Sequence, residues 1–186
     1  MVLEGTDRDL IEGCRRGERD AFRTLFETYK DKVYSIALRF SGDEALAMDI
    51  AQDTFLKLFS SMGEFRGDAA FGTWVYRLVV NSCLDHKRRS WRLIPMADEV
   101  MALLRAPGDA LHSLLHAEVS VRVQGAVEKL PADQRIVVVL RHTEGLAYDE
   151  IAAVLGCSIG TVASRLNRAH KVLGRRLSHL KGSSHV

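Results

Sequence analysis

CSIGTVASRLNRAHKVLGRRLSHLK, residues 157–181, is the stretch of sequence that decides the fold of this chain. From residue 158 onward it carries six Lys or Arg side chains and no Asp or Glu. Directly before it, residues 148–156 read as a short amphipathic helix that ends at a glycine. A short helix, a turn that contains glycine and a longer basic helix follow the plan of a helix-turn-helix. This end of the chain is therefore predicted to bind DNA.

The predicted last helix has two faces of opposite character. Its apolar face is expected to pack on the preceding helix and consists of Val162, Leu166, Ala169 and Leu173. On the other face, guanidinium groups match guanine edges in the major groove, and hydroxyls bond to bases or phosphates. A solvated surface helix is the alternative, and the long run without acids favours DNA binding. The residues predicted to contact duplex DNA, including an N-cap, are Ser158, Thr161, Ser164, Arg165, Arg168 and Lys171.

Charge is distributed unevenly along the chain. The net charge of the 186 residues is only +2, yet residues 121–181 hold 10 Lys or Arg against 5 Asp or Glu. Residues 66–92 form a second basic patch, whereas residues 1–60 lean acidic. Two separate basic patches predict two contacts on one polyanion, and the acidic segment predicts a protein partner.

Helical periodicity runs through the rest of the sequence, and no strand pattern is convincing. The β-branched run Ile136–Leu140 sits inside a helical frame. Residues 93–116 are broken by prolines, so they are expected to form a flexible linker with a short helix near residues 101–104. The predicted fold class is all-α, with two small helical domains joined by this linker and a helix-turn-helix in the second. Helices are predicted over residues 21–40, 43–60, 73–90, 117–129, 132–144, 148–155 and 159–178, with a loop at 61–70.

The cysteines and histidines support neither a disulfide framework nor a metal site. The three cysteines lie far apart and form no CxxC pair, so each is expected to pack as a small apolar side chain. His112 and His116 would share one helix face, a spacing that can bind zinc, but two ligands are too few. No metal or cofactor is therefore expected.

The sequence also predicts where the protein works. It has no hydrophobic run long enough to cross a bilayer, and residues 1–13 lack the basic start and apolar core of a signal peptide. We therefore expect a cytoplasmic protein with no membrane insertion.

Several motifs together resemble bacterial sigma factors of the extracytoplasmic-function group. Residues 49–57, DIAQDTFLK, are similar to the helix by which these proteins bind core RNA polymerase. Residues 65–81, FRGDAAFGTWVYRLVVN, followed by Lys87-Arg88-Arg89, resemble the promoter-reading part of the same group. The second domain of the group is matched in order by LPADQR (130–135), EGLAYDEIA (144–152) and GTVASRLNRA (160–169).

This resemblance implies a function for each part of the chain. Residues 15–92 would bind core RNA polymerase and take up the minus-ten promoter element as single-stranded DNA. Residues 93–116 would be the linker, and residues 117–180 would bind the minus-thirty-five element as duplex. The group acts in stress responses and is commonly held inactive by an anti-sigma factor, so such a partner is implied as well. The residues implied in binding the core polymerase are Asp49, Gln52, Asp53 and Phe55.

The predicted minus-ten site combines aromatic, amide and basic side chains. Unstacked bases are held by aromatic contacts and by neutralised phosphates, and a captured base can be read at its edge. Core packing is the alternative for the aromatic residues; it is preferred for Trp74 and left open for Phe71. From the residues alone, Asp49 and Asp53 read as a solvated face paired with Lys57, and only the resemblance reverses that interpretation. The predicted minus-ten residues are Phe65, Arg66, Phe71, Arg77, Asn81, Lys87, Arg88 and Arg89.

Three positions depart from the pattern of the group. Ala163 replaces a frequent basic residue, Ala147 replaces a frequent Ser and so removes a helix cap, and His170 stands where Arg is common. These changes predict a weaker hold on duplex DNA.

Two other classes of protein were weighed against a sigma factor. A dimeric helix-turn-helix regulator would leave the basic run at residues 87–92 unexplained. A sigma mimic that titrates an anti-sigma factor would not need Arg165, Arg168 or that basic run. An enzyme is not expected, because the sequence has no nucleotide-binding glycine loop, metal constellation or nucleophile elbow.

Overall fold

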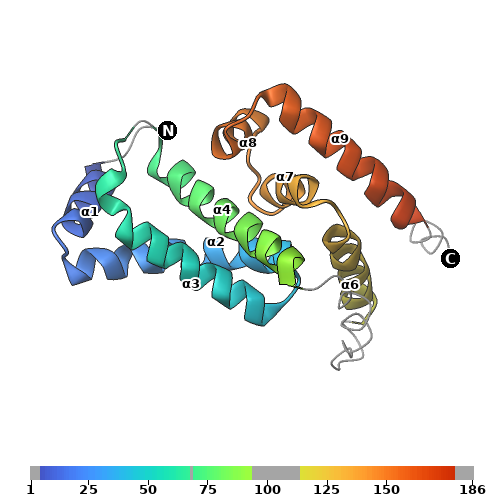
Figure 1. The fold of residues 1–186 in the computed structure, drawn as a ribbon, viewed down its shortest axis with the longest axis horizontal. Helices are drawn as coiled ribbons and strands as arrows, with labels where there is room; N and C mark the ends of the chain where they lie inside the picture. Colours follow the sequence, from blue (N-terminus) through green and yellow to red (C-terminus); the bar gives the residue numbers. More distant parts are fainter. Residues whose placement is uncertain (1–4, 68, 94–113, 179–186) are drawn as a thin grey trace.

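The computed structural model describes residues 5–67, 69–93 and 114–178, and within these ranges the only regular elements are helices (Figure 1). The all-α fold class is therefore confirmed. Most of the predicted linker, with its short helix near residues 101–104, lies outside the described residues. The elements are α1 (Gly5–Arg15), α2 (Arg19–Ser41), α3 (Glu44–Ser60), the 3-10 helix η1 (Met62–Glu64), α4 (Phe71–Leu93), α6 (Leu114–Glu128), α7 (Ala132–His142), α8 (Tyr148–Leu155) and α9 (Ile159–Arg176).

The first half packs α2, α3 and α4 around one apolar centre. In α2 the buried side chains recur at helical spacing: Leu25, Val33, Ile36 and Phe40. Gly42 ends α2 at a φ of 72°, and its N–H donates to the Leu38 carbonyl. Asp43 caps the start of α3, because its side chain accepts from the Leu46 N–H at 2.9 Å. Helix α1, which the sequence did not predict, lies against α2 and buries Ile11 and Cys14.

The second half contains the predicted helix-turn-helix in α8 and α9. Gly156 ends α8 at a φ of 61°, and Ser158 caps α9 by accepting a hydrogen bond from the Thr161 N–H at 3.1 Å. The predicted apolar face of α9 is confirmed, because Val162, Leu166 and Ala169 are buried. Ala147 gives α8 no side-chain cap, but the Glu150 carboxylate accepts from the Ala147 N–H at 2.7 Å and partly replaces one.

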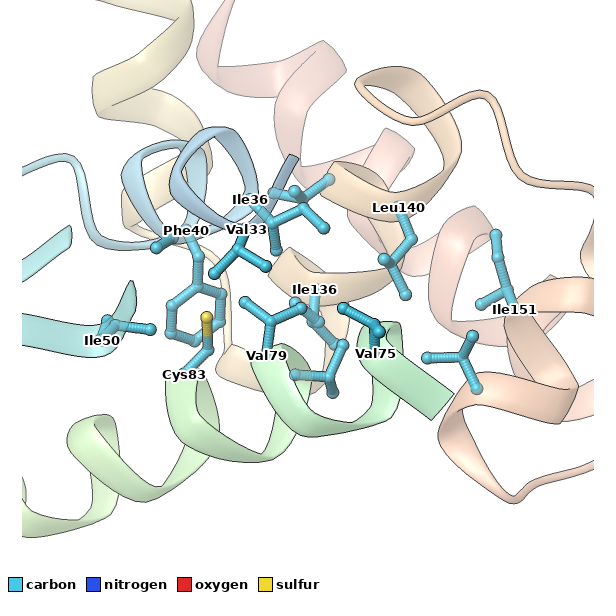
Figure 2. Packing of buried hydrophobic residues seen from close by; sticks show 14 of the residues in the cluster. Val33, Ile36, Phe40, Ile50, Val75, Val79, Cys83, Ile136, Leu140 and Ile151 are labelled. Carbon is cyan, nitrogen blue, oxygen red and sulfur yellow. The ribbon is translucent and has the colours of Figure 1, made fainter. Parts of the chain in front are cut away.

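A single apolar core runs through both halves. Helix α7 lies between the α2–α4 layer and α9 (Figure 1), and all five residues of its run Ile136–Leu140 are buried. Figure 2 shows Ile136 and Leu140 of α7 in one cluster with Val79 of α4 and Ile36 of α2. A helix that is apolar on all sides must be covered on all sides. The two halves therefore pack directly on each other.

The carboxyl end of α2 is bound by donors from the second half. The Arg135 guanidinium is buried; it donates to the Phe40 carbonyl at 2.8 Å and lies 5.1 Å from the centre of the Phe40 ring. It also donates to the carbonyls of Glu128 and Leu130, and burial lowers the pKa of Arg135. Gln124 donates to the Arg39 carbonyl at 3.1 Å. The last carbonyls of a helix have no partner within it, so these donors satisfy groups that burial would otherwise leave unpaired.

We predict that Ile136→Ala destabilises the whole chain. The Ile136 side chain is buried where the halves meet, so its loss leaves a cavity that costs about 2–5 kcal/mol of the free energy of unfolding. Ile159→Ala is the matched control, because Ile159 is exposed. Urea unfolding followed by circular dichroism measures both, and equal values for the two variants would contradict the shared core.

Candidate nucleic-acid and protein interfaces

The outer face of α3 carries an exposed apolar stripe. Met48 and Leu56 are each 60% exposed and lie one turn before and one turn after Gln52, with Asp49 beside them. Helical periodicity groups Met48 with the apolar face of this helix, but Ala47, Ile50, Ala51 and Thr54 fill the buried face and Met48 lies outside it. Exposed apolar residues grouped on one face are typical of a protein-binding surface. Sequence periodicity missed Leu56, although the distance of four residues from Gln52 could have indicated it.

Two of the predicted polymerase-binding residues are engaged within the chain. Phe55 is buried, with its ring centre 4.8 Å from that of Phe26, so it supports the stripe from behind. Asp53 is half-buried, and its carboxylate lies 2.8 Å from the Nε2 of His86 on α4. Sequence reasoning paired Lys57 with the aspartates of its own helix, whereas in the structure it lies 3.3 Å from Asp85 on α4. The unengaged polar groups of this face are therefore Asp49 and Gln52, which are both exposed.

The aromatic residues of the 61–71 loop pack inward. Phe65 is 6% exposed and Phe71 3% exposed, and the Trp74 ring lies 5.2 Å and 5.5 Å from them, centre to centre. Arg15 of α1 donates to the Phe65 carbonyl, so α1 also holds this loop. Core packing therefore accounts for all three rings, and in this arrangement neither phenylalanine is open to stack on a base. Arg66, next to them, is exposed.

Helix α4 carries the remaining predicted minus-ten residues, and one of them, the exposed Arg77, is hydrogen-bonded to the second half. The Arg77 guanidinium donates twice to the Ala153 carbonyl of α8, at 3.0 Å and 2.7 Å. One residue earlier, the Tyr76 hydroxyl donates to the Glu144 carboxylate at 3.2 Å, and burial raises the pKa of Tyr76. Asn81, one turn further on, is exposed.

An open groove follows the end of α4. Its volume is about 620 Å³, and it lies between α4 and the turn that joins α6 to α7. Lys87 and Arg88 lie along it; Arg88 also pairs with Asp85 at 3.2 Å. The side chain of the third predicted basic residue, Arg89, lies outside the described residues. The apolar lining consists of Leu84, Leu130, Pro131 and Ala132, and Asp133 completes it.

On α9 the predicted duplex-binding residues differ in how free they are. Arg168 and Lys171 are exposed. Arg165 is half-buried, and its Nε lies 3.4 Å from the Asp133 carboxylate. The hydroxyls of Ser158 and Thr161 lie 2.9 Å apart, and that of Ser164 donates to the Thr161 carbonyl. The helix therefore presents Arg168 and Lys171 outward, with Arg165 held at their side.

Neither a metal cluster nor a membrane span is evident in the described part of the chain. Within residues 5–67, 69–93 and 114–178, no three His, Cys, Asp or Glu side chains are grouped as metal ligands. None of the described helices is both long and apolar enough to span a membrane.

Comparison with known proteins places both halves in one family. Residues 25–93 match the family Sigma-70 region 2, and residues 120–173 match Sigma-70, region 4. The RNA polymerase sigma-H factor of Pseudomonas aeruginosa is 34% identical over 189 residues, which cover 97% of this chain and 98% of that protein. The ECF RNA polymerase sigma-E factor of Escherichia coli K12 is 34% identical over 191 residues, with the same coverage.

Two solved structures are similar over most of this chain. One is CnrH in complex with the cytosolic domain of CnrY, with a TM-score of 0.68, 27% identity, and coverage of 96% of this chain and 99% of that one. The other is the sigma factor RpoE in complex with the anti-sigma factor NepR from Bartonella quintana, with a TM-score of 0.65, 25% identity, and coverage of 84% and 96%. The resemblance drawn from the motifs is thus confirmed, and the chain belongs to the extracytoplasmic-function sigma factors of bacterial RNA polymerase.

We predict that Cys83 resists alkylation between about pH 7 and pH 9, because its thiol is buried and burial raises its pKa to about 12. Cys157 is only half-buried, so the reagent should reach it first. Mass spectrometry after a short exposure to iodoacetamide measures both. Cys157→Ser is the control and should leave no fast-reacting thiol; rapid labelling of Cys83 would show that the halves do not stay packed.

Proposed function

We propose that this sigma factor binds core RNA polymerase through α3, takes up the minus-ten element as single strand along α4, and reads the minus-thirty-five element as duplex with α9. We assign both core-polymerase binding and minus-ten binding to residues 15–92 together with α1. Residues 93–116 would form the linker, and residues 117–180 would bind the minus-thirty-five duplex. The observation that carries the proposal is the presence of three separate exposed surfaces, one apolar and two basic, on the two family-matched halves. The protein acts as a dissociable, non-catalytic subunit in the cytoplasm.

The polymerase contact is argued from the stripe on α3. Exposed apolar side chains that share a helix face are typical of a protein-binding surface, and Met48 and Leu56 lie on either side of the exposed Gln52, with Asp49 beside them. Asp53 would contribute from beside the stripe, with His86 fixing its carboxylate. Phe55 would act indirectly, because it is buried beneath the same surface.

Leu56→Ser should weaken binding to core polymerase about tenfold or more, because an exposed apolar contact is lost while the fold is kept. Val121→Ser is the matched control, since Val121 is 67% exposed on α6, away from this face. Fluorescence anisotropy of the labelled chain with core polymerase measures both affinities. Wild-type affinity in Leu56→Ser would remove α3 from the interface.

The minus-ten contact rests on the exposed groups of the first half. Since Phe65 and Phe71 are buried, they shape the loop, and the groups open to DNA are the exposed Arg66, Asn81 and Arg88, with the half-buried Lys87 beside Arg88. An amide can read the edge of an unpaired base, and the basic side chains neutralise phosphates beside it. Arg77 would join them once it leaves the Ala153 carbonyl.

We predict that the chain bound to core polymerase prefers a single-stranded minus-ten oligonucleotide to the same sequence as duplex, with affinity that falls as salt rises. Asn81→Ala should reduce discrimination at one base more than it reduces overall affinity, because an amide edge contact carries sequence information. Competition binding over a set of single-base variants tests this. A preference for duplex would contradict the uptake of the minus-ten element as single strand along α4.

On α9, the exposed Arg168 is placed to bond to a base of the minus-thirty-five element. Arg168→Ala should then cost about 1–3 kcal/mol of the free energy of DNA binding and relax the sequence preference at one position. Arg165→Ala should have the smaller effect, since Arg165 is partly engaged by Asp133. Binding to a randomised minus-thirty-five library measures affinity and preference together. If neither variant changes either quantity, α9 is not the reading helix.

Promoter binding requires the two halves to separate. The two elements lie roughly 25 base pairs apart, or about 85 Å along a duplex at about 3.4 Å per pair. In the structure, α4 and α8 are in contact, and Arg77 is bonded to Ala153. The packed arrangement would therefore be that of the free chain, and polymerase binding would open it.

Control by an anti-sigma factor is supported by the similar structures, which contain CnrY and NepR bound to their own partners. The groove along Lys87 and Arg88 is suited to an apolar segment that carries acidic side chains. A segment bound there would cover the basic residues proposed to hold the minus-ten strand and would keep the halves together.

A further inference from the structure

Two histidines from different helices meet on the surface of the second half. His142 is the last residue of α7, and His170 lies in the fourth turn of α9. Their Nε2 atoms are 3.1 Å apart, and their rings lie at 60° with centres 5.3 Å apart. Both side chains are exposed, so water and dissolved ions reach them. The fold, and not the sequence spacing, brings this pair together.

The separation of the two nitrogens matches the bite of a metal chelate. With metal–nitrogen bonds of about 2.05 Å, nitrogens 3.1 Å apart enclose an angle of about 98° at the metal. A right angle, as in octahedral or square-planar coordination, needs about 2.9 Å, and a tetrahedral angle needs about 3.3 Å. The observed distance lies between these two values, and because both rings are exposed they can turn until both Nε2 lone pairs point at one ion.

The contact between the two rings determines which proton must move before a metal binds. A nitrogen–nitrogen contact at 3.1 Å requires one Nε2 to act as an acceptor, so at least one ring is neutral. The other Nε2 donates in this contact, so metal binding requires that ring to hold its proton on Nδ1 instead, which leaves a lone pair on both Nε2 atoms.

From this geometry we infer that His142 and His170 form a chelating site for a divalent transition-metal ion, with water in the remaining coordination positions. Imidazole suits Zn²⁺, Ni²⁺ and Cu²⁺, whereas Mg²⁺ and Ca²⁺ prefer oxygen ligands and are not bound. Two protein ligands do not make a closed structural zinc site, so the ion is exchangeable. Its bound form joins the end of α7 to α9 and stabilises the packing of the helix proposed to read duplex DNA.

The test is a calorimetric titration of the full chain with ZnCl2 and with NiCl2, with MgCl2 as the negative control. His142→Ala and His170→Ala should each lower the affinity for Zn²⁺ and Ni²⁺ at least tenfold. Because the two residues form one site, the double variant should have about the same affinity as either single variant. Nitrogen NMR of the wild type should show the Nε2 signals of both residues shifting together on addition of Zn²⁺. His142→Gln and His170→Gln are second variants that keep a polar group at each position.

The chain supplies its own controls, because metal could bind elsewhere. His112→Ala with His116→Ala removes the other histidine pair, and Cys157→Ser removes the half-buried thiol; neither change should alter the affinity. If these variants lose binding while His142→Ala and His170→Ala keep it, the ion sits at another place. If the wild type binds no Zn²⁺ or Ni²⁺ at millimolar concentration, the pair is a hydrogen bond only.

Discussion

The burial of α7 on every side is the constraint on which this structure depends. One face of α7 packs against α8 and α9 of the helix-turn-helix, and its opposite face is covered by α2 and α4. Neighbouring residues of α7 bind α2 in two ways. Ile136 lies in the apolar cluster with Ile36 of α2, and Arg135 donates to the Phe40 carbonyl at the end of the same helix. The apolar packing and the polar groups thus specify one arrangement of the two halves.

This arrangement links stability to function. The helix proposed to hold the minus-ten strand, α4, is also the helix on which α7 and α8 rest. Gly42 lies at the same junction, where an added Cβ would overlap the Glu128 side chain of α6. Promoter binding would exchange these internal contacts for contacts with polymerase and DNA, so the affinity for a promoter includes the free energy of separating the halves.

Sequence reasoning predicted the helices well but not their assembly. Periodicity located α2, α3 and α4, and glycine and serine signals located the turn between α8 and α9, because these features are local. The shared core is not local, although Ile136–Leu140 carried a sign of it: five consecutive apolar residues place apolar side chains on every side of a helix, and such a helix has to be covered on every side. In the sequence, Phe65 and Phe71 are compatible both with stacking on DNA bases and with packing in the core. Only the positions of the surrounding helices determine that they are buried. The exposure of Met48 and Leu56 likewise depends on where α2 and α4 lie.

The central claim, that the free chain is closed and opens on polymerase, is tested most directly by a distance between the halves. Spin labels on Glu44→Cys of α3 and Arg175→Cys of α9, in a Cys157→Ser background, leave only the buried Cys14 and Cys83 as other thiols. Electron–electron resonance should give one narrow distance in the free chain and a longer one with core polymerase and promoter DNA. A broad distribution in the free chain that does not change on binding would contradict the account.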